Sequence, residues 1–458
     1  MRCGRLGCNL KALTVSALLL RLYSAAMRLA QPLLRRKMAR RAVQEPGYAE
    51  AIDERFGRYT QPRETASNLV WLHAVSLGET RAAAILLKAL RAREPGLRVL
   101  LTHGTATGRA EGRALLQPGD VQVWQPWDTH AVVEHFFEHF KPRLGLLIET
   151  EVWPCLVASA HARGTPLVLV NGRLSEKSLQ QALRLSPLAR PAYGALTAVY
   201  AQTESDAARY RQLGAHVAGV FGNLKFDAQP DPAQQALGKT WRESLPQQMR
   251  QPVVMLASSR EGEEALFLEQ IKLFAQQIRA REAINSIVPK WLIVPRHPQR
   301  FDEVAALAAQ SGLSVSRRSS WPGSPAQSAD ASQADVWLGD SLGEMALYYC
   351  LADVALLGGS FEKLGGQNLI EAAAAGCPVV MGPHTFNFAE AAQLAVESGA
   401  AFSCADISGA VAFALQLVAD EPALASASLA AAAFSSNHQG VTERYAGALA
   451  AFLEPRAA

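Results

Sequence analysis

Residues 354–376 read VALLGGSFEKLGGQNLIEAAAAG. Four apolar residues run directly into a glycine pair, and a second glycine pair precedes a stretch with helical pattern. A strand that passes through a glycine-rich turn into a helix is the repeating unit of a doubly wound sheet, and the turn offers backbone N–H groups to an anion. The stretch therefore predicts an α/β fold with a phosphate site at this turn. A tight turn that needs glycine only for its dihedral angles is the alternative.

The same alternation of apolar runs and helical stretches extends through most of the chain, in two series. The first series predicts strands at Leu69–Val75, Arg98–His103, Val121–Trp124, Leu144–Ile148, Leu167–Val170, Ala198–Ala201 and Val217–Phe221. The second predicts strands at Val253–Ala257, Trp291–Val294, Leu313–Ser316, Val336–Leu338, Val354–Leu357, Pro378–Met381 and Ala401–Phe402. Because such alternation builds parallel sheets covered by helices, the sequence predicts two Rossmann-like doubly wound domains that face a cleft.

We place these domains at residues 45–228 and 252–458, joined by a linker at 229–251 that is rich in Gln and Pro. The second domain is expected to include an Ala-rich helical tail from Ala423 onward. A polar stretch, Arg317–Asp335, is expected to be an exposed loop.

Length and charge restrict the class of protein. With 458 residues the chain is too long for one ordinary core, which supports two domains. Residues 1–44 hold ten of the 45 basic residues and none of the 41 acidic ones, so the remainder carries 35 basic and 41 acidic residues, a net charge of −6. A body of this charge lacks the basic face that nucleic acid requires, so no nucleic-acid partner is predicted. The six cysteines are scattered, which predicts reduced thiols.

The N-terminal segment, residues 1–44, combines apolar and basic residues at helical spacing. Polar side chains recur every three or four positions, at Arg21, Ser24, Arg28, Gln31 and Arg35. This pattern predicts an amphipathic helix that lies in the plane of an anionic membrane and is ended or kinked by Pro32. Three alternatives stay open: a spanning helix, for which the uncharged run Ala12–Leu20 is short, a signal peptide, and a helix packed on the body.

Residues that follow strands of the second series form a candidate phosphate site, because ligands of doubly wound sheets bind beyond the carboxyl ends of the strands. A cation held between prolines at Pro295, Arg296 and His297 suits a phosphate. The other candidates are Ser258, Gly358, Gly359, Gly365, Gly366, the helix cap Asn368, and Glu371 as a ribose ligand. The acids Glu263 and Glu264 are interpreted as first-turn helix charges.

The first series carries its candidates at the corresponding positions. In the run His73-Ala74-Val75-Ser76-Leu77-Gly78-Glu79 the strand gives way to a helix, and Glu79 is a candidate general base beside Ser76 and Gly78. A helix N-terminal acid with no catalytic role is the alternative. Further candidates after strands are Glu149, Glu151, Asn171, Arg173 and Lys225. No His-x-x-x-His, cysteine-pair or Asp-x-Asp pattern occurs here, so no metal is predicted.

Together these segments resemble the 3-deoxy-D-manno-octulosonic acid (Kdo) transferase family of lipopolysaccharide synthesis. The resemblance runs from the basic N-terminus through His73–Glu79, Glu149–Pro154, Asn171–Ser175, Gly222–Asp227, Ala257–Glu264, Val294–Pro298 and Gly358–Phe388. It implies a GT-B glycosyltransferase that moves Kdo from CMP-Kdo to the lipid A precursor at the cytoplasmic face of the inner membrane, without cofactor or metal. It also implies that Glu79 is the catalytic base and that Pro295, Arg296, His297, Asn368 and Glu371 hold CMP.

Three positions depart from the pattern expected of that family. Gln367 and Arg260 stand where histidine is usual, and Ala372 replaces proline. Two rival interpretations stay open from the residues alone. One is a nucleotide-sugar epimerase with the same fold, and the other is a non-enzymatic membrane adaptor.

Overall fold

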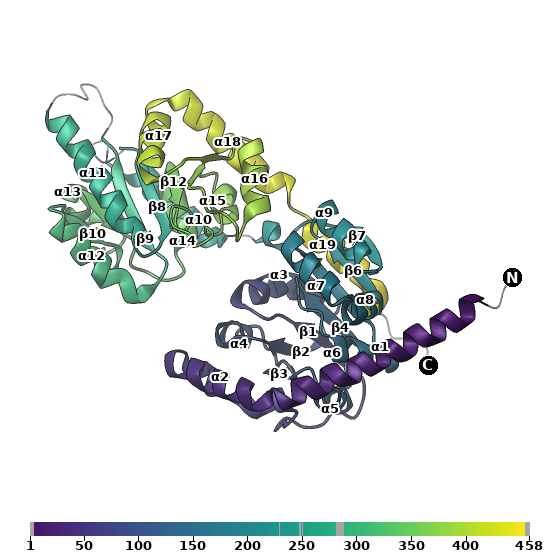
Figure 1. Ribbon diagram of the computed structural model, residues 1–458. Coiled ribbons are helices and arrows are strands. Elements are labelled where there is room, and N and C mark those ends of the chain that lie inside the picture. Colours follow the sequence, from purple (N-terminus) through teal and green to yellow (C-terminus); the bar gives the residue numbers. More distant parts are fainter. Residues whose placement is uncertain (1–3, 229, 247–248, 250, 281–287, 454–458) are drawn as a thin grey trace. The chain divides into compact units, whose positions relative to one another are not determined.

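A computed structural model describes residues 4–228, 230–246, 249, 251–280 and 288–453 (Figure 1). Of the ranges predicted from the sequence, residues 1–3, 229, 247–248, 250, 281–287 and 454–458 lie outside the described residues. The chain divides into two compact units. Unit 1 comprises Met1–Asp227 with Gly440–Ala458, and unit 2 comprises Ala228–Gln439.

Unit 1 is built on a seven-stranded parallel sheet in the order β3-β2-β1-β4-β5-β6-β7. The strands are β1 (Leu69–His73), β2 (Arg98–His103), β3 (Val121–Trp124), β4 (Leu144–Ile148), β5 (Leu167–Gly172), β6 (Ala198–Ala201) and β7 (Val217–Val220). The helices are α1 (Gly4–Leu29), α2 (Gln31–Gln44), α3 (Leu77–Arg93), α4 (Ala106–Arg113), α5 (His130–Phe140), α6 (Pro154–Ala162), α7 (Glu176–Arg184), α8 (Ser186–Gly194), α9 (Glu204–Gln212) and α19 (Val441–Leu453). Every residue of β1 and β4 is buried, as expected of strands covered on both faces.

Unit 2 repeats the architecture with the strand order β10-β11-β9-β8-β12-β13-β14, again parallel. The strands are β8 (Val253–Ser259), β9 (Lys290–Pro295), β10 (Val315–Arg317), β11 (Val336–Leu338), β12 (Val354–Leu357), β13 (Val379–Met381) and β14 (Ala401–Ser403). The helices are α10 (Pro232–Ser244), α11 (Glu263–Arg279), α12 (Phe301–Gln310), α13 (Ala329–Gln333), α14 (Met345–Leu351), α15 (Ile370–Ala374), α16 (Ala389–Glu397), α17 (Ile407–Ala419) and α18 (Glu421–Asn437). All fourteen predicted strands are present, with ends that differ by at most two residues.

The N-terminal segment forms two consecutive helices, α1 and α2, with a break at Ala30 and Pro32 in the first turn of α2 (Figure 1). Helix α1 packs on the unit 1 body: Trp127 Nε1 donates to the Met27 carbonyl at 2.8 Å, and the His130 N–H donates to Ser24 Oγ at 2.9 Å. Within the described residues no single helix has the length and apolar composition of a membrane span. Two helical segments, Ile407–Ala419 and Glu421–Leu453, are bent by 106° relative to each other. Taken together they have the length and composition of a membrane span, and only these two properties support that reading.

The boundaries of the two units differ from the predicted domains in two places. The predicted linker contains helix α10, which packs on unit 2 because Trp241 is buried there and Arg242 Nη2 donates to the Asp353 carboxylate at 2.6 Å. The end of the Ala-rich tail belongs to unit 1, where the Asp227 carboxylate accepts from the Gly440 N–H at 2.7 Å and Tyr445 Oη donates to the Gly222 carbonyl at 3.1 Å.

The stretch Arg317–Asp335 is not the exposed loop predicted from its composition. It contains helix α13 and buries Trp321, whose ring lies 5.6 Å from that of Trp337. The buried Trp321 ring and the bonds from Ser319 to Asp340 hold this polar segment on the body of unit 2.

Candidate functional site

The strand order of unit 1 puts its topological switch point between β1 and β4. From this point the chain builds β2 and β3 on one side and β5, β6 and β7 on the other, and doubly wound sheets bind ligands at the carboxyl ends of the two central strands. Glu79 follows β1, whereas Glu149 and Glu151 follow β4. The predicted carboxylates of unit 1 therefore meet at the edge where a ligand is expected.

Glu79 lies in the first turn of α3, with its carboxylate folded back toward β1. Its Oε2 accepts a hydrogen bond from the Val75 N–H at 2.7 Å, and Ser76 Oγ donates to its Oε1 at 3.3 Å. Ser76 Oγ in turn accepts from the Glu79 N–H at 3.4 Å, so Ser76 is the N-cap of α3. The Ser-x-x-Glu spacing thus has a structural role of its own, and a catalytic role of Glu79 depends on the environment of its carboxylate. At Gly78 the protein leaves room for a side chain, since a Cβ would meet only Ser76 Oγ at 4.0 Å.

The environment of Glu79 favours the protonated form. The residue is 8% exposed. Burial, and then the charges of Glu149 and Glu151, raise the pKa of Glu79 from 4.5 to about 8, against the opposing bond from the Val75 N–H. A carboxylate with such a pKa is suited to take a proton near neutral pH, and values this far from the ordinary range gather at functional sites.

Glu149 begins the loop after β4 with φ at 68°, a left-handed backbone that is strained for a residue other than glycine. Its carbonyl accepts from the Arg173 N–H at 3.1 Å and from Tyr210 Oη at 3.2 Å, and these bonds hold the conformation. Its carboxylate lies 2.8 Å from Lys225 Nζ and 3.4 Å from Asn171 Nδ2. Asn171 and Lys225, singled out after two other strands, thus meet at the Glu149 carboxylate, whereas Arg173 bonds to the Glu149 backbone carbonyl.

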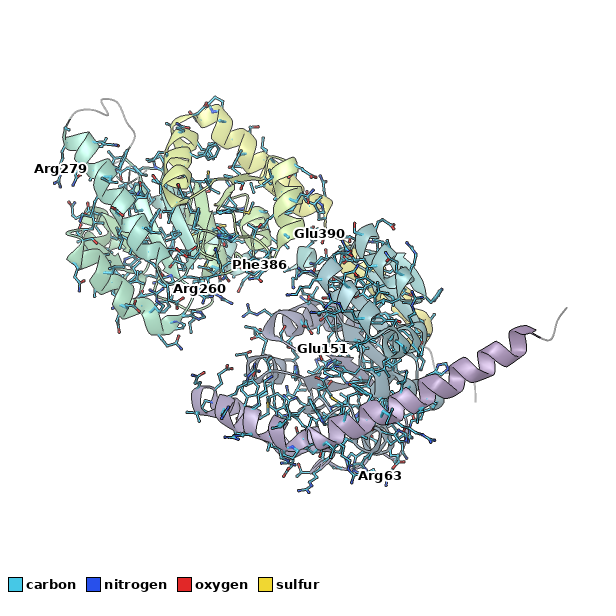
Figure 2. The ribbon with its side chains drawn as sticks, viewed as in Figure 1. Arg63, Glu151, Arg260, Arg279, Phe386 and Glu390 are labelled. Atoms are coloured by element: carbon cyan, nitrogen blue, oxygen red, sulfur yellow. The ribbon has the colours of Figure 1, made fainter. Side chains whose placement is uncertain are left out.

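Glu151, which is labelled in Figure 2, has other hydrogen-bond partners than Glu79. Its Oε2 accepts from Trp153 Nε1 at 2.7 Å and from Gln125 Nε2 at 3.1 Å, and it lies 3.6 Å from His73 Nε2. Although burial opposes them, these partners lower the pKa of Glu151. Neighbouring carboxyl groups whose environments push their pKa values apart are a mark of acid–base sites.

Unit 2 has its switch point between β8 and β12, and the glycine-rich turn follows β12. The turn requires glycine at Gly358, because a Cβ there would lie 2.3 Å from the Ser258 carbonyl oxygen. The sequence predicts that its N–H groups are open to an anion. Instead, the Gly359 N–H donates to Glu263 Oε2 at 2.8 Å and the Phe361 N–H to Glu263 Oε1 at 3.2 Å. These two donors are already bonded to a carboxylate of the protein.

The second glycine pair packs against the loop after β13. Gly365 has φ 90°, and a Cβ on it would meet Phe386, which is labelled in Figure 2, at 2.5 Å. The Gly366 N–H donates to the Gly359 carbonyl at 2.7 Å, so the two pairs fold onto each other. The prediction that Asn368 caps the helix is wrong, because the N-cap of α15 is Leu369 and no side chain caps it. Asn368 Oδ1 accepts from the Ile370 N–H at 3.1 Å just before the helix, and its Nδ2 donates to Glu371 Oε1 at 3.4 Å.

Positive charges gather where β8 and β9 end. The Arg296 N–H donates to the Ser259 carbonyl at 3.0 Å, which fixes the Pro295–His297 turn beside β8. The pKa of His297 is lowered by burial and then by the charges of Arg260, labelled in Figure 2, and Arg296. A cluster of this kind favours a phosphate.

The Glu371 side chain belongs to the same end of unit 2. Burial raises the pKa of Tyr349, the Glu371 carboxylate raises it further, and the Arg296 guanidinium opposes them. Both charges therefore act on one buried phenol of α14.

Sequence reasoning missed two groups of residues in unit 2. Glu263 and Glu264 are fully buried and do more than balance a helix dipole. The loop after β11, residues 340–345, lies at the same sheet edge because β11 pairs with β9, and Met345 Sδ lies 3.9 Å from Ser258 Oγ. The sequence could have pointed to this loop, because the loop follows the predicted strand Val336–Leu338. Among the described residues, no group of three or more His, Cys, Asp or Glu side chains is arranged to hold a metal ion.

The chain is similar to known proteins both in sequence and in fold. The sequence model of the family described as "3-Deoxy-D-manno-octulosonic-acid transferase (kdotransferase)" matches residues 50–228. A 3-deoxy-D-manno-octulosonic acid transferase of Bordetella pertussis is 46% identical over 441 residues, which cover 94% of this chain and 99% of that protein.

Two solved structures are similar in fold alone. A glycosyltransferase of Rickettsia africae has a TM-score of 0.53 at 10% identity, over 85% of this chain and 99% of that one. The UDP-GlcNAc 2-epimerase of Neisseria meningitidis has a TM-score of 0.52 at 14% identity, over 83% and 99%. Transferases and epimerases share this architecture, so the fold does not decide between them.

Two parallel seven-stranded sheets covered by helices confirm the predicted GT-B architecture. The sequence identity decides the family, because it extends over nearly the whole of both proteins. The chain belongs to the 3-deoxy-D-manno-octulosonic acid transferase family of glycosyltransferases.

Proposed function

We propose that this protein transfers Kdo from CMP-Kdo to the lipid A precursor (lipid IVA), with inversion at the anomeric carbon. The observation that carries the proposal is the buried carboxyl group of Glu79 at the switch point of unit 1, with its pKa raised to about 8. A group of this kind can accept a proton from a sugar hydroxyl as that hydroxyl attacks.

The proposed reaction is one direct displacement. The acceptor hydroxyl oxygen forms a bond to the anomeric carbon of Kdo while the bond from that carbon to the CMP phosphate oxygen breaks. The hydroxyl proton passes to Glu79, and CMP leaves as a phosphate monoester. We assign the base and acceptor residues to unit 1 and the donor residues to unit 2.

The donor residues are proposed to hold CMP through its charge and its ribose. Arg296, with Arg260 and His297 beside it, supplies positive charge for the phosphate and for the charge that grows on it as the bond breaks. Glu371, whose Oε1 accepts from Asn368 Nδ2, is proposed to accept hydrogen bonds from ribose hydroxyls. No resident cofactor or metal is part of the proposal.

A variant of Glu79 tests the assignment of the base. Glu79→Ala is expected to abolish transfer of Kdo to the acceptor while CMP still binds, because the donor residues lie on unit 2. Transfer is followed by mass spectrometry of the lipid and CMP binding by calorimetry. Normal turnover by Glu79→Ala would remove Glu79 as the base. Conversion of the sugar nucleotide without any acceptor would favour an epimerase instead.

We also propose that helices α1 and α2 place the protein on the cytoplasmic face of the inner membrane, parallel to the surface. Leu18, Leu22 and Leu29 follow one another at helical spacing and are 57%, 58% and 81% exposed. Arg21 and Arg28 lie exposed on the flank of this leucine stripe. Exposed leucines beside arginines suit the interface of an anionic bilayer.

Flotation with vesicles tests the membrane proposal. The full chain is expected to float with phosphatidylglycerol vesicles and less with phosphatidylcholine vesicles. Leu22→Glu is expected to reduce flotation, whereas Leu429→Glu, at a leucine of unit 2 that is 73% exposed, serves as the control and should float like the wild type. Equal flotation of both variants and the wild type would contradict the proposal.

A further inference from the structure

Glu263, the first residue of α11, lies fully buried between two turns of unit 2. Its Oε2 accepts from the Gly359 N–H at 2.8 Å and from the Arg260 N–H at 3.0 Å. Its Oε1 accepts from the Phe361 N–H at 3.2 Å. One carboxylate thus joins the turn after β8 to the glycine-rich turn after β12, at the switch point of the sheet.

Glu264 extends this connection to the turn after β9. Its Oε1 accepts from Ser259 Oγ at the end of β8, at 2.7 Å, and from Arg300 Nη1, also at 2.7 Å. Arg300 lies three residues after His297 of the Pro-Arg-His turn, and its guanidinium also reaches Glu303 at 3.1 Å. Three turns that carry candidate donor residues are therefore held together by two adjacent buried carboxylates.

The chemistry of this connection requires a carboxylate. Both oxygens of Glu263 act only as acceptors, and they satisfy one buried backbone N–H group, that of Gly359, and two partly buried ones. Burial raises the pKa of Glu263 and the three N–H bonds oppose it. A glutamine has one accepting oxygen, so its amide nitrogen would meet a backbone donor, and buried donors left without partners are costly.

We propose that Glu263, supported by Glu264, is a positioning residue for the nucleotide donor: it fixes the Arg260 and Gly359 turns in the arrangement that binds CMP, without touching CMP itself. The inference rests on the proposed function, because it assumes that these turns hold the donor. It also implies that the donor phosphate is not bound by the N–H groups of Gly359 and Phe361, since the protein's own carboxylate occupies them.

Asp353 provides a matched control within the same sheet. It joins the same two strands at their opposite ends: its carboxylate accepts from the Val253 N–H at 2.7 Å and from Arg242 Nη2 at 2.6 Å. Loss of this carboxylate should weaken the β8–β12 connection without disturbing the turns at the carboxyl ends. Glu263→Gln and Asp353→Asn therefore separate positioning of the donor turns from general stability of unit 2.

The experiment measures the Kd of CMP by calorimetry and the KM for CMP-Kdo and for the acceptor with the full chain, at a temperature at which both variants are folded by circular dichroism. Glu263→Gln is expected to raise the CMP Kd and the donor KM by about tenfold or more, because unpaired donors displace the turns. Its acceptor KM should stay near the wild-type value, and Asp353→Asn should keep wild-type values of all three constants. Glu263→Ala with added formate is expected to regain CMP affinity, since formate can accept the same N–H bonds.

A wild-type CMP Kd and donor KM in Glu263→Gln, or an equal loss in Asp353→Asn, would overturn the inference. If Glu263→Gln does not fold, Ser259→Ala is measured in its place, because it removes one bond to Glu264. Ser259→Ala should also raise the donor KM, and an unchanged donor KM in this variant would overturn the inference. Failure of the wild type to bind CMP would instead count against the proposed function.

Discussion

Replacement of Glu79 by glutamine is expected to stabilise the folded protein at alkaline pH while it removes the proposed base. The folded protein holds the Glu79 proton up to a pKa of about 8, whereas the unfolded chain releases it near 4.5. Between pH 4.5 and pH 8 the folded protein binds more protons than the unfolded chain, so the contribution of Glu79 to stability falls as the pH rises through this range. At 1.4 kcal/mol for each pKa unit, the carboxyl group costs about 5 kcal/mol above pH 8 and roughly 3 kcal/mol at pH 7.

The gain in the free energy of unfolding expected for Glu79→Gln is smaller than the cost of the ionised carboxyl group, because the substitution can break the hydrogen bond that Ser76 Oγ donates to Oε1. We expect the free energy of unfolding to rise by about 2 kcal/mol or more at pH 8.5 and to stay nearly unchanged at pH 4.5. Urea unfolding followed by circular dichroism measures both values. Glu204→Gln is the control: Glu204 is also in the first turn of a unit 1 helix, but its side chain is 79% exposed. A Glu79→Gln protein that is no more stable than the wild type at pH 8.5 would refute this account of the carboxyl group.

Three further predictions concern neighbouring groups. Because the charge of Glu149 raises the pKa of Glu79, Glu149→Gln is expected to move the acid limb of the pH profile of kcat/KM to lower pH. Lys225→Met removes the cation 2.8 Å from Glu149 and is expected to move the same limb to higher pH. An acid limb that does not move in either variant would contradict this coupling. Arg296→Ala is expected to weaken CMP binding in calorimetry by about tenfold or more, whereas an unchanged affinity would remove Arg296 from the donor site. Trp321→Ala is expected to lower the free energy of unfolding of unit 2 by roughly 3–5 kcal/mol in urea, since it empties a buried aromatic cluster; a change below about 1 kcal/mol would show that the segment packs without it.

Much of the fold could be predicted because parallel strands buried on both faces leave continuous apolar runs in the sequence. The predicted strands Arg98–His103 and Val354–Leu357 match the structure at both ends. Prediction failed where contacts between residues far apart in the sequence hold a segment, as at α19. Asp227 binds the Gly440 N–H and so carries α19 to unit 1, and no local pattern near residue 440 encodes that bond.

The candidate site shows the same limit. Position after a strand was enough to single out Glu79, Glu149, Asn171 and Lys225, because the carboxyl ends of parallel strands share one edge. The partners of a buried carboxylate are not encoded in spacing. Glu263 has the sequence position of an ordinary first-turn acid, and only the structure shows that it occupies the N–H groups of the glycine-rich turn.

The most direct test of the central claim combines the pure protein, CMP-Kdo and the lipid A precursor, and weighs the lipid by mass spectrometry. The wild type is expected to yield a lipid heavier by one or more Kdo residues with release of CMP, and Glu79→Gln is expected to bind CMP but leave the lipid unchanged. A lipid of unchanged mass with the wild type, or a normal yield of product with Glu79→Gln, would contradict it.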